Sequence, residues 1–458
     1  MYKVFAILFS VATFLVACTD TEIISIEDET PTNTDLVEGV HFDTVFSKHI
    51  TLEDARKELE VFLGSNATSI SKSGTTGFPS KRIAAGFVMN LGKKSLSKSN
   101  ANNTDAKIYV FNFEDDGGFA LMSSSRETPP IFAITEEGNL DTTKEIDNPG
   151  FAIFMANLET KLLNGELNYD ADTLFQDTLT TLSKLYTPSK TIQWSVFSPY
   201  REDTYKHKNG LCPYWHQYYP FNRQCDSAGR RAYVGCVPVA CGLLMAIYRH
   251  PISYKDTILH WDDMLSNIYN NDIAWLLRKL GDKENLSAIY GTIDSSDGTP
   301  AFSNYIPRTL RNFGYSNGGV YGNYNTSVVC SDLKQGYPVL ISGKEYRIDS
   351  IRANGVVDTF YEGGHQWIGQ GLLVRTRDEY HYIGEREYTQ FVGMTTETDY
   401  YVLCNMGWRG TRCNGYYLSR VFDVADGPVF PETYSKSIKM GRDGYYQYYI
   451  KAVTGIRK

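Results

Sequence analysis

Apolar and polar positions in the first third of the chain follow different periods, and each period predicts an element. Residues 51–63 repeat apolar side chains at helical spacing, which predicts an amphipathic helix with Thr51 as its N-cap. Residues 82–91 predict a strand between two loops, at 64–80 and 95–104, that are rich in Ser, Thr, Gly and Asn.

A hairpin and a second helix are predicted further along this part of the chain. Apolar runs at residues 108–113 and 119–122 flank the sequence Asp-Asp-Gly-Gly at 115–118, which is a turn signal between two strands. Residues 151–163 then predict another amphipathic helix. These elements together predict a small α+β unit in the first third of the chain.

The run from Val237 to Tyr248 is apolar on every side, which predicts a helix buried inside a domain. Pro238 fits its first turn, where a missing N–H costs nothing, and residues 249–251 supply cationic side chains and a proline at its end. Strand-like runs from Tyr337 onward predict an antiparallel sheet. Because 458 residues exceed the usual length of one domain, we expect two folded parts.

The N-terminus carries a targeting pattern. Lys3 precedes an apolar run from Val4 to Val16, which is too short to span a bilayer and is typical of a signal peptide. The run ends in Ala17-Cys18 and looks like a bacterial lipobox, which predicts cleavage before Cys18 and lipidation of that residue. No later segment reaches the 18 or more apolar residues of a spanning helix, so we expect an anchored protein.

Charge and cysteine content narrow the function classes. A formal net charge of −8 argues against nucleic acid as a partner. Apart from Cys18 and Cys236, six cysteines remain, and the near pairs Cys212/Cys225 and Cys404/Cys413 are candidates for disulfides in an exported protein. No Cys-x-x-Cys or His-x-x-x-His spacing occurs, so we expect no metal and no cofactor.

Candidate chemistry centres on Cys236, which stands at the start of the buried helix. A free thiol has a pKa of about 8.5, and a helix N-terminus with an adjacent imidazolium can lower that pKa below 7. His365, followed by an apolar pair, and Asn405 come later in the chain, in the order expected of a papain-like thiol protease. Taken alone, Cys236 would be interpreted as a structural or disulfide cysteine, and it is the surrounding motifs that favour a nucleophile.

Several motifs beyond Cys236 resemble the streptopain family of secreted cysteine peptidases. Gly-Cys-Val followed by a small apolar helix is similar to the nucleophile segment of that family. Gly-Gly-His at 363–365 stands where the family has its histidine, and Asn-Met-Gly-Trp at 405–408 is similar to its Asn-Trp-Gly-Trp motif. The resembling segments are residues 194–200, 260–264, 308–315, 336–340, 404–410 and 414–418. The resemblance covers most of residues 190–458.

The resemblance implies a papain-like α+β peptidase domain and a role for each matching residue. Cys236 would be the nucleophile, His365 the general base and acid, and Asn405 the acceptor that orients the imidazole. Gly235 and Trp408 would shape the site.

Two positions depart from the family pattern. In the family, an aromatic-x-Gln-x-x-Pro-Tyr segment near the start of the mature enzyme supplies a glutamine that helps form the oxyanion hole. Residues 194–200 resemble this segment but place Val196 at the glutamine position, and valine cannot donate a hydrogen bond. Gln193 could substitute only if the local register differs. Met406 stands where the family has a tryptophan, a milder change because methionine fills irregular space.

The unit at residues 51–178 resembles the pro-segment of streptopain-type zymogens. The expected organisation is a signal peptide at 1–17, a lipidated tether at 18–50, the pro-segment at 51–178, an activation linker at 179–193 and the papain-like peptidase domain at 194–458. A permanent binding domain ahead of the enzyme is the alternative.

These observations predict a membrane-anchored lipoprotein zymogen of a cysteine endopeptidase, exported to a bacterial envelope. Its expected partners are polypeptide substrates, its own pro-segment as an intramolecular inhibitor, a membrane through the lipid, and a separate proteinaceous inhibitor. Two alternatives remain open. One is a catalytically inactive binding lipoprotein of the same fold, and the other is an acyltransferase or transglutaminase-like enzyme with similar Cys-His chemistry.

Overall fold

A computed structural model describes the folded parts of the chain. The described residues are 49–68, 81–91, 106–141, 147–169, 192–227, 229–291, 298–344, 346–351, 357–362, 364–385, 388–409, 412–423 and 448–458. The signal peptide, Cys18 and the tether, the loop at 95–104 and most of the expected linker at 179–193 lie outside these residues.

The first third of the chain folds largely as its sequence predicts. Helix α1 (Leu52–Thr68) runs five residues beyond its predicted end and lies beside strands β1 (Ile83–Asn90) and β2 (Lys107–Phe113). Thr51 is its N-cap, because the Thr51 hydroxyl accepts from the Asp54 N–H at 3.1 Å while the Asp54 carboxylate accepts from the Thr51 N–H at 3.3 Å.

The predicted hairpin is also present. A 3₁₀ turn, η1 (Glu114–Asp116), joins β2 to β3 (Phe119–Ser123), and β4 (Ile131–Thr135) follows. Helix α2 (Pro149–Leu163) begins at Asn148, whose side chain caps the Phe151 N–H. Residues 149–158 of α2 are all buried, so the amphipathic pattern predicted for this helix is limited to its last turn.

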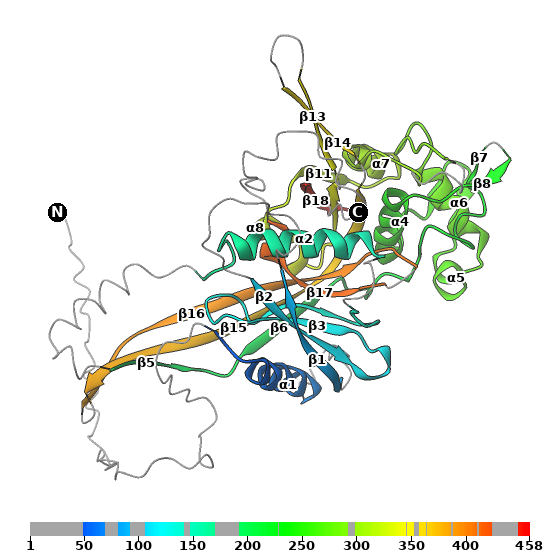
Figure 1. Ribbon diagram of the computed structural model, residues 1–458. Coiled ribbons are helices and arrows are strands. Elements are labelled where there is room, and N and C mark those ends of the chain that lie inside the picture. Colours follow the sequence, from blue (N-terminus) through cyan, green and yellow to red (C-terminus); the bar gives the residue numbers. More distant parts are fainter. Residues whose placement is uncertain are drawn as a thin grey trace, which may run out of the picture.

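Twelve strands of the described chain form one antiparallel sheet, and this sheet joins the two folded parts (Figure 1). The main order is β1-β2-β3-β4-β17-β16-β15-β12-β18-β11. Strand β4 pairs with β17 (Gly415–Leu418), with Ala133, Ile134 and Thr135 opposite residues 417, 416 and 415. The first third of the chain is therefore fused to the rest through backbone hydrogen bonds.

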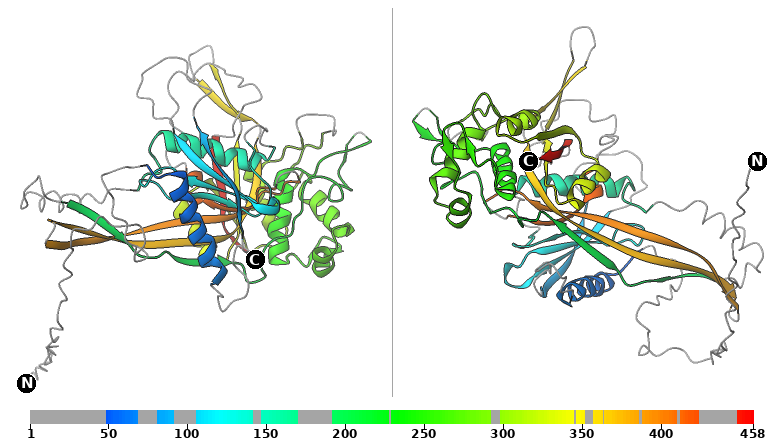
Figure 2. Two further views of the ribbon diagram at one scale, coloured as in Figure 1. Left: turned by 60° about the horizontal axis from the view of Figure 1, so that its bottom comes forward. Right: turned by 180° about the vertical axis from the view of Figure 1, so that it is seen from behind.

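A long hairpin of β15 (His365–Glu385) and β16 (Tyr388–Asn405) projects from the body of the molecule (Figure 2). Beyond β12 (Val339–Lys344), β15 pairs with β6 (Arg201–Lys206) and then with β5 (Ile192–Phe197). The far part of this hairpin therefore carries the segment at 192–197.

The helical half packs around α4 (Cys236–Tyr248), which is buried from Val237 to Tyr248 as predicted. The other elements of this region are short. They are β7 (Asp226–Ser227), β8 (Arg230–Arg231), β9 (Ser253–Tyr254), β10 (Thr257–Ile258), α5 (Trp261–Ser266), α6 (Asn271–Leu280), η2 (Ser303–Tyr305) and α7 (Ile306–Asn312).

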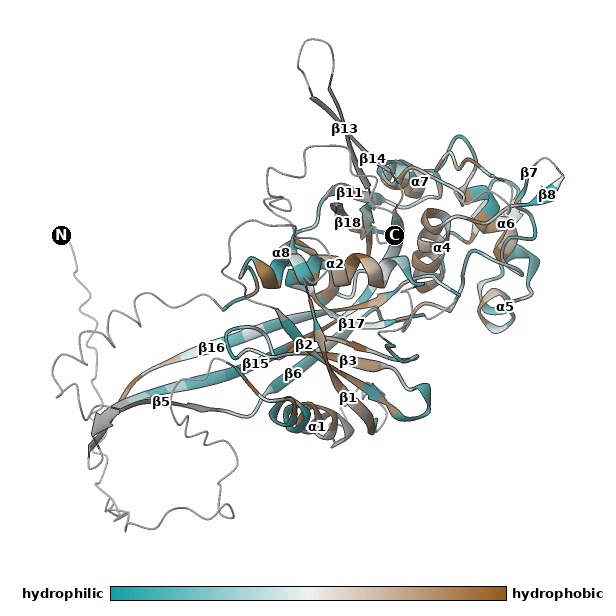
Figure 3. Ribbon diagram, viewed as in Figure 1, coloured by the Kyte–Doolittle hydropathy of each residue, from teal (hydrophilic) through white to brown (hydrophobic). Residues whose placement is uncertain are grey.

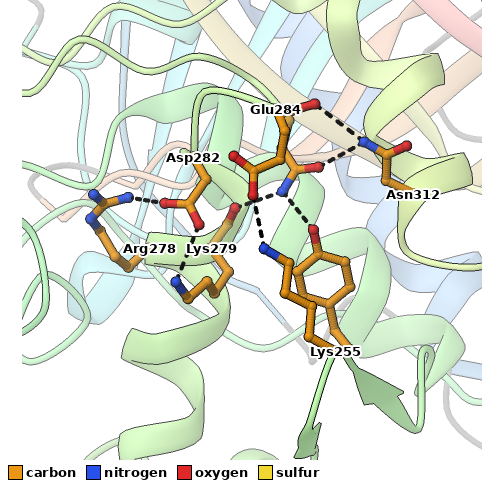
Figure 4. A network of polar contacts seen from close by, with 8 residues as sticks. Lys255, Arg278, Lys279, Asp282, Glu284 and Asn312 are labelled. Carbon is orange, nitrogen blue, oxygen red and sulfur yellow. Dashed lines mark hydrogen bonds and ion pairs between the residues drawn. The ribbon is translucent and has the colours of Figure 1, made fainter.

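A polar network holds the segments around α6 and α7 together (Figure 4). The fully buried Asn285 amide donates to the Tyr254 hydroxyl at 3.1 Å and to the Lys279 carbonyl at 2.9 Å, and its oxygen accepts from Asn312 at 3.0 Å. Lys255 pairs with Glu284 at 2.9 Å. Because a buried amide is costly unless its hydrogen bonds are made, this network fixes the loop that supports α7.

The remaining strands and helices complete the sheet and its cover. They are β11 (Asn317–Asn323), α8 (Thr326–Lys334), β13 (Tyr346–Ile351), β14 (Val357–Glu362), α9 (Ser419–Phe422) and β18 (Tyr448–Arg457). Strands β12, β15 to β18 confirm the antiparallel sheet predicted from Tyr337 onward.

Helices α2 and α4 cover opposite faces of the sheet. Successive residues of a strand point to opposite faces, and Leu340 and Ile368 belong to the core around α4, whereas Ile341 and Trp367 belong to the core that includes α2. Both helices are apolar over most of their length (Figure 3). Helices α2 and α4 are therefore separated by the sheet to which His365 belongs.

Candidate active site

Cys236 is the first residue of α4, and Gly235 sets its position. Gly235 is the N-cap with φ 92° and ψ 143°, a backbone conformation that residues with a Cβ rarely adopt. A Cβ at this position would also lie 2.7 Å from the carbonyl oxygen of Thr299. Glycine is therefore required for the chain to enter α4 here.

The thiol of Cys236 is half-buried and lies beside the start of β15. Burial raises the pKa of Cys236 above its usual value, while the N–H groups of Gln366, Cys236 and Val237 and the charge of Lys344 act in the opposite direction. The expected thiolate is therefore not the favoured form in this structure, which corrects the sequence expectation for the full-length chain.

His365 is the first residue of β15 and is 4 % exposed. Its Nε2 lies 2.7 Å from the carbonyl oxygen of Met406, so Nε2 carries a proton and donates it to that carbonyl. Burial lowers the pKa of His365 to about 4, although the Met406 carbonyl raises it. At neutral pH the ring is uncharged, and its Nδ1 is the basic nitrogen.

The His365 side chain lies on the face of the sheet that α2 covers. Its ring stacks over Trp367 at a centroid distance of 6.3 Å and meets Trp408 edge-on at 5.7 Å. A Cβ on Gly150, in the first turn of α2, would lie 2.5 Å from the Met406 sulfur and 3.4 Å from His365 Cδ2. The start of α2 therefore packs directly against Met406 and His365.

Asn405 does not make the contact that the sequence predicts. Its Nδ2 lies 3.3 Å from the Cys212 sulfur and 3.4 Å from the Pro213 carbonyl, and its Oδ1 accepts from the Gly407 N–H at 2.9 Å. The acceptor for the imidazole is the neighbouring backbone carbonyl of Met406. Asn405 thus shapes the loop that supplies this carbonyl.

Val196 lies far from Cys236 and His365, because β5 pairs Val196 with Tyr380 on the outer part of β15. Tyr380 is 15 residues beyond His365, a distance on the order of 50 Å at about 3.3 Å per residue. Gln193 is opposite Ile383, farther out still. The structure therefore does not bring the segment at 194–200 to the site, and the interpretation of Val196 as the oxyanion position is corrected.

Gln217 lies near the turn that carries Cys236, and the sequence analysis did not identify it as a candidate site residue. Its backbone carbonyl accepts from the Val234 N–H at 3.0 Å, only two residues before Cys236. The signal was present, since residues 215–221 read Trp-His-Gln-Tyr-Tyr-Pro-Phe, which fits the pattern aromatic-x-Gln-x-x-Pro-aromatic better than residues 194–200 do.

The other expected features of the site concern cysteines and metals. All seven described cysteines are free, including both predicted near pairs. The described ranges contain no cluster of three or more His, Cys, Asp or Glu side chains that could bind a metal ion. Every helix in these ranges is too short or too polar to cross a membrane.

Two family models match the chain one after the other. Residues 47–162 match the Spi protease inhibitor family, and residues 215–417 match the Peptidase C10 family. Among solved structures, the chain is similar to a fragment of prointerpain A from Prevotella intermedia, at 16 % identity and a TM-score of 0.43, over 80 % of this chain and 98 % of that one. No curated protein matches the chain.

The fold and these matches define a cysteine-type peptidase preceded by an inhibitory pro-segment. Residues 215–417 carry the match to the Peptidase C10 family, the streptopain family, and the inhibitor match ahead of them gives the domain order of a zymogen. The predicted α+β papain-like domain with a smaller α+β pro-domain is confirmed. The matched peptidase region begins at Trp215, so it includes Gln217 and excludes Val196.

The raised pKa of Cys236 makes a prediction for its reactivity. At pH 7 less than about 3 % of the thiol should be thiolate, the fraction of a free cysteine, so iodoacetamide should label Cys236 of the full chain slowly. The labelling rate should rise only as pH increases beyond about 8.5. Peptide mapping against a Cys236→Ser variant measures this, and rapid labelling at pH 6 would contradict it.

Proposed function

We propose that this zymogen becomes an endopeptidase in which Cys236 is the nucleophile and His365 the general base and acid. Nδ1 of His365 removes the thiol proton, and the Cys236 sulfur attacks the scissile carbonyl carbon. The imidazolium then protonates the leaving amine, which gives an acyl-enzyme. Water, deprotonated by His365, attacks the thioester and releases the acid and the free thiol.

Negative charge on the carbonyl oxygen during attack requires hydrogen-bond donors. The backbone N–H of Cys236 at the start of α4 is one, and we assign the side-chain amide of Gln217 as the second. The support for Gln217 is its bond to Val234 next to the Cys236 turn. Gly235 permits the turn, and Met406 and Trp408 enclose the imidazole.

Inhibition rests on the position of the pro-segment, and this observation carries the proposal. Gly150, in the first turn of α2, lies next to both Met406 and His365. The Asn148 side chain also donates to the Arg412 carbonyl at 2.8 Å, so the start of α2 is fixed to the loop after Met406. The His365 ring is thus held on the α2 face and bonded to Met406, while Cys236 packs against the core around α4.

Activation then requires the pro-segment at 51–178 to leave after cleavage in the linker at 179–193, ahead of the peptidase domain at 194–458. Leaving breaks the β4–β17 pairing and uncovers the α2 face of the sheet. Export through the signal peptide at 1–17, lipidation of Cys18 and tethering through residues 18–50 would put this step in a bacterial envelope, with release after processing.

The test is to incubate residues 19–458 under reducing conditions beside a Cys236→Ala variant and follow intact mass. We expect the wild type alone to lose a fragment ending between about residues 179 and 193, and to hydrolyse unfolded protein substrates afterwards. If a second protease removes the pro-segment and neither chain hydrolyses peptides, the endopeptidase proposal is wrong.

The same processed proteins also test the two alternative functions, an inactive binding protein and an acyltransferase. In an inactive binding protein, Cys236 would stay unreactive after processing. The main argument for this alternative is a missing oxyanion glutamine, and Gln217 next to the Cys236 turn weakens that argument. An acyltransferase would form amide products when an amine acceptor is added, because the acyl-enzyme would pass its acyl group to nitrogen instead of water.

A further inference from the structure

A cavity of about 410 Å³ opens beside the proposed active site, and its lining combines apolar walls with positive charge. Asn405 and Trp408 form its border toward His365. The other lining residues are Tyr214, Trp215, His216, Phe221, Ile268, Arg409, Arg412 and Asn414. None of the ten lining residues is acidic, and two are arginines.

Both arginines act on this cavity. The Arg412 guanidinium lies 4.7 Å from the centre of the Tyr214 ring, and that of Arg409 lies 5.8 Å from the centre of the Tyr218 ring. Burial, together with the charges of Arg409 and Arg412, lowers the pKa of His216 to about 4. His216 therefore stays neutral near pH 7, and the arginines supply the charge of the cavity.

A carboxylate of the pro-segment already uses one of these arginines. Glu137 Oε1 lies 3.0 Å from Arg412 Nη1, and both side chains are about two-fifths exposed. An ion pair this exposed to water adds little to stability, so one carboxylate can replace another at Arg412 with little loss. Glu137 leaves with the pro-segment, whereas Arg412 remains with the peptidase.

We propose that Arg412, with Arg409, forms a subsite that binds an Asp or Glu side chain of the polypeptide substrate, and that Glu137 occupies this subsite in the zymogen. The inference rests on the proposed peptidase function and names part of its specificity. The apolar walls accommodate the methylene groups of glutamate, and the guanidinium groups bind its carboxylate. The same position should reject lysine, because a cation would face two arginines.

The experiment compares peptides that differ only in Glu, Gln or Lys at successive positions around one cleavage site. It uses the full chain after its pro-segment has been removed. At one position we expect kcat/KM for Glu to exceed that for Gln by about three- to tenfold and that for Lys by more. Arg412→Gln should bring the Glu/Gln ratio to about one. Arg249→Gln, which removes an arginine at the far end of α4, should leave the ratio unchanged.

Binding without turnover separates this proposal from the peptidase assignment. Calorimetry with the processed Cys236→Ala chain should give a lower Kd for the Glu peptide than for the Gln peptide, and Arg412→Gln should remove the difference. Discrimination in binding with no hydrolysis by wild type would reject the function and keep the subsite. Equal Kd values for both peptides, or a loss of discrimination with Arg249→Gln as well, would overturn the subsite.

Discussion

Replacement of Gln217 by alanine is expected to lower kcat/KM of the processed enzyme by about 100- to 1,000-fold, mainly through kcat. This is the typical effect of removing one oxyanion donor, because the donor stabilises charge that exists only in the transition state. Gln217 lies one backbone hydrogen bond from the turn that carries Cys236. Steady-state kinetics on a peptide substrate measure the effect.

Gln193→Ala is the matched control, since it removes the same side chain from β5, opposite Ile383 on the outer part of β15. We expect it to change kcat/KM by less than about twofold. The rate of Cys236 alkylation should be similar in both variants, because the oxyanion donor acts on the substrate and not on the thiol. If Gln193→Ala impairs kcat and Gln217→Ala does not, the assignment must be reversed.

The choice between these two glutamines shows where sequence reasoning stopped. Residues 194–200 and 215–221 both contain an aromatic residue followed five positions later by Pro-aromatic, and only the second segment has glutamine at the third position. Choosing between them requires knowing which segment lies next to Cys236. That depends on the pairing of β5 with β15, a contact between residues about 190 positions apart in the chain.

Local patterns, in contrast, predicted the elements well. The all-apolar run at 237–248 can be stable only when buried, and α4 is buried there. The Thr51 cap and the turn at 115–118 depend on neighbouring residues alone, and both are present. The full burial of α2 was missed because it results from contact with a sheet formed much later in the chain.

The surroundings of His365 could not be predicted from the sequence either. Asn405, the last residue of β16, suggested an orienting amide, but the ring bonds to the backbone carbonyl of Met406 instead. A backbone acceptor has no signature in side-chain identity. Which face of β15 the ring occupies is likewise set by the register of the strand and by the pro-segment packed on it.

Gly150→Val in the full chain is expected to accelerate both self-processing and Cys236 alkylation by about fivefold to a hundredfold. A Cβ at this position would lie 2.5 Å from the Met406 sulfur, so the larger side chain must displace either the Met406 side chain or α2. Met406 is fully buried and has little room to move, which favours displacement of α2. Overpacking of this kind costs about 1–3 kcal/mol, and each 1.4 kcal/mol changes an equilibrium about tenfold. The weakened contact is the one that packs the start of α2 against His365 and Met406.

Leu163→Val provides the control for this prediction, because it introduces the same β-branched residue at the exposed end of α2, where Leu163 is 42 % exposed. It should leave both rates within about twofold of wild type. Peptide mapping shows whether Gly150→Val acts locally, since unfolding of the whole chain would also expose buried thiols such as Cys241 and Cys404. Selective labelling of Cys236 supports release of the site. An unchanged Cys236 rate would mean that the start of α2 does not restrain His365, and inhibition would then have to come from the β4–β17 pairing alone.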